Sequence, residues 1–110
     1  MNENIFTYVM PRKGACASAR LVFPEMVILR DSVVAQHVVR SMPAAYRQLR
    51  ERLIDQGVLA MVSGELKFTR DYRFANSSEA VCVVEGGSRD GYDSWRNAQG
   101  QTLGNLGYRR

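Results

Sequence analysis

The sequence has little of what metal sites and membrane anchors require. It contains one histidine, His37, and two cysteines. Cys16 and Cys82 are far apart and belong to no CxxC motif, so they cannot form a recognisable zinc site with His37. The apolar runs are strand-sized, far below the roughly 20 residues of a membrane-spanning helix. We therefore expect no metal and no membrane span.

The N-terminus lacks the basic flank and the apolar stretch of a secretory signal. This indicates a cytoplasmic protein whose cysteines remain reduced thiols with a packing role.

The motifs of several catalytic classes are also missing. No GIY or YIG element precedes a catalytic arginine and glutamate, one histidine cannot build an HNH cluster, and there is no methylase-type dinucleotide fingerprint or P-loop. His37 stands among valines, which is typical of a packed or surface histidine. We expect neither an enzyme nor a cofactor, so the chain should act by binding.

What is present describes an ordinary small domain. The 110 residues are 45% hydrophobic and 24% charged, which predicts one folded domain over 1–110. The net charge is +4, and arginine supplies every cationic side chain except Lys13 and Lys67. Arginine suits phosphate and carboxylate recognition. A genomic bias toward arginine would give the same composition, so both interpretations stay open.

The order of residue patterns predicts an α+β domain with an antiparallel sheet of about five strands, one main amphipathic helix and one short helix. The valines within 33–40 leave that stretch undecided between strand and other structure. The expected segments are a strand meander over 5–30, a helix over 43–56, a hairpin over 58–70, a short helix over 78–85 and a Gly/Trp motif over 86–106.

The main helix has clear ends, with Pro43 in the first turn and Gly57 just past the last. Its charged side includes Arg47 and Arg50, a possible surface for a partner. The apolar side is expected to contain Tyr46, Leu49, Leu53 and Ile54.

The start of the short helix is a candidate phosphate site. The amides of Ser77 and Ser78 could face an anion, and Arg70 and Arg73 lie just before them. The alternative is ordinary helix capping, with Glu79 near the same amides. The glycines that follow this helix favour a C-cap and turn over a phosphate loop, because the helix dipole is negative there.

Two aromatic residues follow. Tyr92 and Trp95 could stack on bases, with Arg89 and Arg96 beside them. A single tryptophan in a small domain more often anchors the core, which is the alternative for Trp95.

A run of residues carries a family resemblance, which includes Asp71-Tyr72-Arg73-Phe74 and a serine-capped helix of small residues. The chain resembles the domain of unknown function appended to the C-terminal side of GIY-YIG-type nuclease-like proteins, and it is similar to the restriction-enzyme and adenine-methylase associated domain. The resemblance implies a setting of DNA modification and restriction, and a role in recognising DNA. The structural motif that it implies comprises Gly57, Phe74, Gly86, Gly91, Trp95, Gly100 and Leu103.

This chain departs from the family pattern in two places. Where the family reads Phe-Ser-Ser-Pro-Ser, this chain reads Phe74-Ala75-Asn76-Ser77-Ser78, and where it reads Asn-Gly-Trp, this chain has Asp90-Gly91-Tyr92. The carboxylates of Glu79 and Asp90 would oppose a phosphate nearby.

The sequence thus predicts a binding module for nucleic acid, DNA above all, in restriction-modification or phage-host defence. The alternative is a protein-interaction module, or a small inhibitor of a bacterial defence complex, that does not contact DNA. The residues expected to contact nucleic acid are Arg70, Arg73, Ser77, Ser78, Arg89, Tyr92 and Arg96.

Overall fold

The fold comes from a computed structural model that describes residues 4–108. It is an α+β domain with an antiparallel sheet, which confirms the predicted fold class. No helix within residues 4–108 is long and apolar enough to cross a membrane. In chain order the elements are β1 (Ile5–Met10), a 3-10 turn (Pro11–Lys13), β2 (Ala15–Val22), β3 (Glu25–Ile28), β4 (Val33–Val34), α1 (Ala44–Asp55), β5 (Leu59–Val62), β6 (Glu65–Phe68), β7 (Tyr72–Phe74), α2 (Ser77–Glu85) and α3 (Gly91–Ser94).

The sheet is built around β2. Strand β1 pairs with one edge of β2, and β3 and β4 share the opposite edge. Beyond them, β7 pairs with β3, β6 pairs with β4, and β5 pairs with β6.

The sheet has seven strands rather than about five, because β4 lies in the undecided stretch 33–40 and β7 was not predicted. Asp31 adopts a left-handed conformation (φ 73°) between β3 and β4, which breaks that line of chain into two short strands. The break between β6 and β7 lies beside it, since the backbone N–H of Asp31 donates to the Phe68 carbonyl. The undecided stretch 33–40 therefore starts as strand β4 and continues without regular structure.

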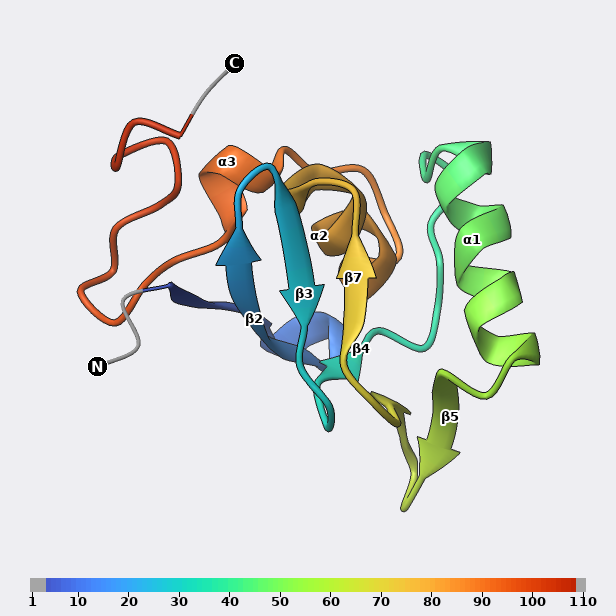
Figure 1. The fold of residues 1–110 in the computed structure, drawn as a ribbon. Coiled ribbons are helices and arrows are strands. Elements are labelled where there is room, and N and C mark those ends of the chain that lie inside the picture. Colours follow the sequence, from blue (N-terminus) through green and yellow to red (C-terminus); the bar gives the residue numbers. More distant parts are fainter. Residues whose placement is uncertain (1–3, 109–110) are drawn as a thin grey trace.

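Alternation along β2 separates the two faces of the sheet. Ala15, Ala17, Ala19 and Leu21 are buried on the inner face, whereas Cys16, Arg20 and Val22 point outward and are exposed. Helix α2 lies behind β3 and β7 in Figure 1, on the inner face. The alanines of β2 leave room for the helix to approach closely.

The core lies between α2 and the inner face. Val81, Val84, Phe68 and Trp95 are fully buried there. Burial of each large apolar side chain contributes about 1.5–3 kcal/mol, so these contacts supply most of the stabilisation that joins helix and sheet.

Helix α1 begins after Pro43 and ends before Gly57, whose φ of 75° permits the Val58 N–H to reach the Leu53 carbonyl at 2.9 Å. The helix is one residue shorter at each end than the predicted 43–56. The prediction that Ile54 belongs to the apolar side of this helix is wrong, because its side chain is 45% exposed.

The hairpin of β5 and β6 is also confirmed. Ser63 and Gly64 both have positive φ, 53° and 84°, which gives the two-residue turn whose twist matches that of antiparallel strands. This hairpin extends from the lower right of the domain in Figure 1, below α1.

Candidate functional site

The sequence-predicted site residues lie in two places in the structure. Arg70 and Arg73 lie just before and within β7, at one end of the sheet. Arg89 and Arg96 lie beside β1, at the other end. Strands β2 and β3 separate the two groups.

The start of α2, the candidate phosphate site, is capped by the protein's own groups, which is the alternative that the sequence left open. The cap residue is Asn76 rather than Ser77 or Ser78: its Oδ1 accepts from the Glu79 N–H at 2.8 Å. Glu79 in return accepts from the Ala75 N–H at 2.9 Å. This arrangement is close to a capping box, with the Glu79 carboxylate bonded one residue before the cap. It occupies the Glu79 amide and places a carboxylate at the helix start, which opposes an anion there.

Gly91 covers the same helix start. Its N–H donates to Ser78 Oγ at 2.9 Å, and a Cβ at residue 91 would overlap Ser77 Oγ and the backbone of both serines. Ser77 is buried. The two serines therefore hold α3 against α2, and their amides are enclosed.

Trp95 lies in the core, which is the alternative to base stacking that the sequence left open. It is fully buried, and its Nε1–H donates to the Ser77 carbonyl at 3.0 Å. Tyr92 is half-buried and packs against the same core. Trp95 is therefore not available for base stacking, and Tyr92 only in part.

Helix α1 offers less charged surface than its sequence suggests. Arg50 is 3% exposed, and its guanidinium donates to the carbonyls of Val83, at 2.8 Å, and Ala35. Burial lowers the pKa of Arg50. The prediction that Arg50 belongs to a partner surface is therefore wrong. Arg47 is half-buried.

The outer face of the sheet brings arginines together. Arg20 on β2 lies opposite Val27 on β3, which in turn lies opposite Arg73 on β7, so all three side chains share one face. Both arginines are exposed, and Val27 is buried between them. Burial of Val27 fits the aliphatic stems of the two arginines lying over it. No helix lies in front of β2, β3 and β7 in Figure 1.

The charges on this face are only partly neutralised. Arg73 forms an ion pair with Glu25. Arg20 is exposed and has no ion-pair partner within residues 4–108. Arg96 joins the same face, because it pairs with Thr7, an outward-facing residue of β1. The outer face is therefore a basic surface of the sheet.

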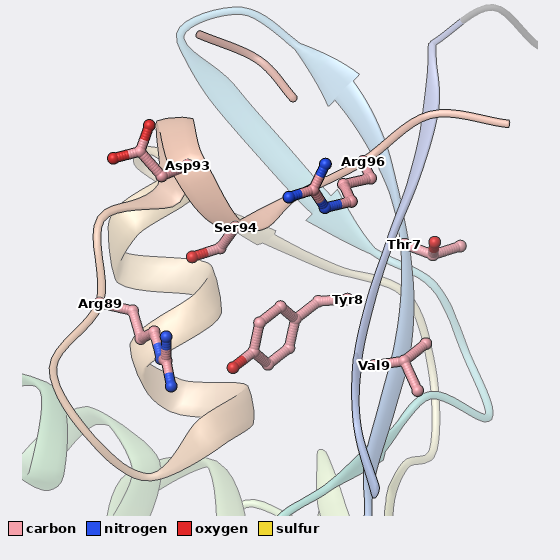
Figure 2. Close-up of a pocket in the computed structure, with 7 residues that line it drawn as sticks. All are labelled: Thr7, Tyr8, Val9, Arg89, Asp93, Ser94 and Arg96. Atoms are coloured by element: carbon pink, nitrogen blue, oxygen red, sulfur yellow. The ribbon is translucent and has the colours of Figure 1, made fainter. Parts of the chain in front are cut away.

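A pocket of about 280 Å³ lies at the free edge of β1 (Figure 2). Figure 2 shows Arg89 and Ser94 on one side and the strand β1 on the other, with the Tyr8 ring extending from β1 toward Arg89. The residues that line it are Thr7, Tyr8, Val9, Arg89, Asp93, Ser94 and Arg96. Two of the predicted arginines thus meet at one small cavity.

A buried carboxylate lies beneath this pocket. Glu85 is 3% exposed and accepts from the Tyr8 hydroxyl at 2.9 Å and from Arg89 Nε, with Lys13 Nζ at 3.6 Å. Burial opposes ionisation of Glu85, but the hydrogen bonds from Arg89 and Tyr8 and the charges of Arg89 and Lys13 outweigh it, so its pKa is lowered. Burial and the bond to Glu85 raise the pKa of Tyr8 to about 12. This network fixes Arg89 at the pocket wall.

The sequence interpretation missed Arg20. Its signal was present, because residues 15–22 alternate between small apolar and larger or polar side chains, and Arg20 falls on the outward positions with Cys16 and Ser18. Within residues 4–108, no three histidine, cysteine, aspartate or glutamate side chains gather as metal ligands would.

Comparison with known proteins gives one match. The model of a family described as a domain of unknown function, DUF4357, matches residues 8–107. No curated protein and no solved structure matches the chain. Because the family model spans nearly all of the chain, this protein belongs to the DUF4357 family.

Proposed function

We propose that the protein is a non-catalytic DNA-binding module that contacts the phosphate backbone through the outer face of its sheet. The observation that carries this proposal is the open row of Arg20, Val27 and Arg73, which no helix covers. Arginine at an exposed, incompletely neutralised surface is the usual means of phosphate contact.

The kind of side chain on this face favours backbone contact over base stacking. The outward residues of β1, β2, β3 and β7 include no aromatic side chain. Proteins that bind single strands without sequence preference rely on aromatic stacking platforms. We therefore expect duplex DNA to bind at least as well as single strands, with little sequence preference.

The spacing of the arginines also suits a sugar-phosphate backbone. Arg20 and Arg73 are separated by one intervening strand, so their Cα atoms lie about 10 Å apart at a strand spacing of about 4.8 Å. Guanidinium groups on flexible stems can reach two phosphates from such positions. Arg96 extends the surface at the β1 edge, and Arg70 is an exposed residue that immediately precedes β7.

The test is the salt dependence of DNA binding. Log affinity for duplex DNA should fall linearly with log salt, with a slope of about 0.9 per phosphate neutralised, or roughly 3 to 4 in total. Replacing both Arg20 and Arg73 with glutamine should lower that slope by about two and leave the melting temperature nearly unchanged.

The matched control replaces Arg40 and Arg52, two exposed arginines away from the outer face, with glutamine. It removes the same charge, so its slope should stay near that of the parent protein if contacts rather than net charge decide binding. Absence of binding at low salt to duplex, single-stranded and adenine-methylated DNA would exclude the proposal.

A protein partner is the second candidate, and exposed apolar residues favour it. Ile54 at the end of α1 and Met61 and Val62 on β5 are between 42% and 56% exposed. A complex that forms at high salt and is lost on Met61→Asp would support this function instead. In either case, we propose a setting of DNA restriction, modification or phage-host defence, as the resemblance implies.

A further inference from the structure

The free edge of β1 is only partly paired. The Leu21 N–H of β2 donates to the Asn4 carbonyl. By alternation, the even-numbered residues of β1 direct their backbone N–H and C=O groups toward β2, and the odd-numbered residues direct theirs outward. Thr7 belongs to the outward set and exchanges two hydrogen bonds with Arg96, at 2.8 and 3.0 Å. Val9 belongs to the same set, and its N–H and C=O form no hydrogen bond with any residue of 4–108.

Val9 is one of the residues that line the pocket in Figure 2. If the segment that contains Arg96 continued along β1, Ser94 would lie opposite Val9. Instead, Ser94 ends α3 and its hydroxyl donates to the Asp90 carbonyl at 2.7 Å. The strand position opposite Val9 is therefore left open as a cavity.

The shape of this edge limits what can fill it. An extended chain paired with Val9 cannot continue past Thr7, because Arg96 already occupies that edge. In the other direction, β1 ends at Met10 and the chain turns into Pro11–Lys13. An extended peptide can therefore enter from the Met10 end, running antiparallel to β1, and must terminate where it meets Arg96.

The charges at the closed end suit a terminal carboxylate. Arg89 is oriented by Glu85, and Arg96 by the bond from its Nη1 to the Gly100 carbonyl at 2.8 Å. Both guanidinium groups keep further N–H donors, which pair well with a carboxylate. Asp93 on the same wall disfavours a ligand group with two negative charges.

We propose that this pocket binds the C-terminal residue of an extended peptide, with its carboxylate between Arg89 and Arg96 and its backbone paired with Val9. In this arrangement the Val9 N–H donates to a carboxylate oxygen, and the N–H of the ligand's last residue donates to the Val9 carbonyl. This is strand addition limited to one residue. The site shares Arg96 with the basic outer face but does not include the arginine row of Arg20 and Arg73.

The first test uses synthetic peptides and the unmodified protein. In a two-dimensional amide NMR titration with acetyl-Ala-Ala-Ala-Val bearing a free carboxylate, the Val9 amide should shift in a saturable way. The C-terminal amide of the same peptide, and a peptide N-methylated at its last residue, should each bind at least about tenfold more weakly. Equal binding by all three peptides would overturn the proposal.

Two further arms distinguish the source of the carboxylate. Acetate alone should not saturate the shift at the concentration that suffices for the peptide, because it cannot pair with the Val9 carbonyl. Acetyl-Ala-Asp-Ala-amide carries its carboxylate on a side chain and should bind at least about tenfold more weakly than the free C-terminus. Equal binding by this peptide would show recognition of any acidic segment and contradict the proposal.

The second test changes the protein. Val9→Pro removes the N–H that faces the pocket, and proline is tolerated at edge positions whose N–H points away from the ladder. It should weaken the peptide by about tenfold, whereas Val9→Ala should change affinity little. If Val9→Pro fails to fold, the N-methylated peptide still tests the pairing with Val9, through the bond to its carbonyl. Neither variant should alter the salt slope of DNA binding, so the two proposals can fail separately.

Discussion

At the residue scale, Arg50 shows how a charged side chain can belong to a core. It lies one turn after Tyr46 and one turn before Leu53, the same side of α1 that packs on the domain. The helical spacing is consistent with a position on this packed side, but a charged side chain is usually predicted to be exposed. Only the carbonyls of Val83 and Ala35, which come from other elements, make the buried position possible, and the sequence does not reveal them.

Substitution of Arg50 should therefore be costly. Arg50→Ala removes the donors to two buried carbonyls and leaves a cavity, so we expect a loss of about 2–4 kcal/mol in the free energy of unfolding. Arg52→Ala, on the exposed side of the same helix, should cost less than about 1 kcal/mol. Urea denaturation of the two variants checks this, and equal losses would show that Arg50 does not stabilise the fold.

At the scale of elements, the sequence predicts where helices and strands occur better than how they meet. Helix α1 and the β5–β6 hairpin have strong local signals, Pro43, Gly57 and Ser63-Gly64, and both were found. The sequence predicts a serine cap for α2. Asn76 and the two serines are all good caps, so the local pattern alone does not decide among them. The choice depends on Gly91, which packs against the serines from a different part of the chain.

The contact between α2 and α3 should tolerate no side chain at residue 91. Gly91→Ala should destabilise the protein by about 2–4 kcal/mol, because the new Cβ would overlap the backbone of Ser77 and Ser78. The comparison variant is Gly100→Ala, where no atom lies within 4 Å of the new Cβ and only the left-handed φ of 79° opposes the change. We expect about 1 kcal/mol there. A smaller loss at Gly91 than at Gly100, measured by urea denaturation, would contradict the packing argument.

At the scale of the whole molecule, the buried Glu85 joins parts that are distant in sequence. Tyr8 comes from β1, Lys13 from the turn that follows it, and Arg89 from the loop after α2. The sequence places these residues far apart, and no local pattern pairs them. Patterns of alternation and capping thus predict the layers of this fold, whereas the polar contacts that link the layers depend on tertiary packing.

This network should make stability depend on pH in two windows. Because the folded pKa of Glu85 is lowered, its contribution is present above the ordinary carboxyl value of 4.5 and is lost as the pH falls below it. Because the pKa of Tyr8 is raised from 10.0 to about 12, its contribution is present below pH 10 and is lost as the pH rises toward 12. In a plot of the urea midpoint against pH, Glu85→Gln should reduce the fall at acid pH, and Tyr8→Phe should reduce the fall at alkaline pH. If the dependence of the urea midpoint on pH is unchanged in both variants, other groups cause it.

The alternation of β2 also has a practical consequence. Cys16 is exposed on the outer face, whereas Cys82 is buried within α2, where burial raises its pKa and so disfavours the reactive thiolate. A maleimide dye should therefore modify the native chain at Cys16 alone and reach Cys82 only after unfolding. Cys16 shares its row with Val9 on β1, next to the pocket, and its face with Arg20. The chain thus carries its own attachment point for a fluorescent reporter, placed between the two surfaces whose ligands are to be identified.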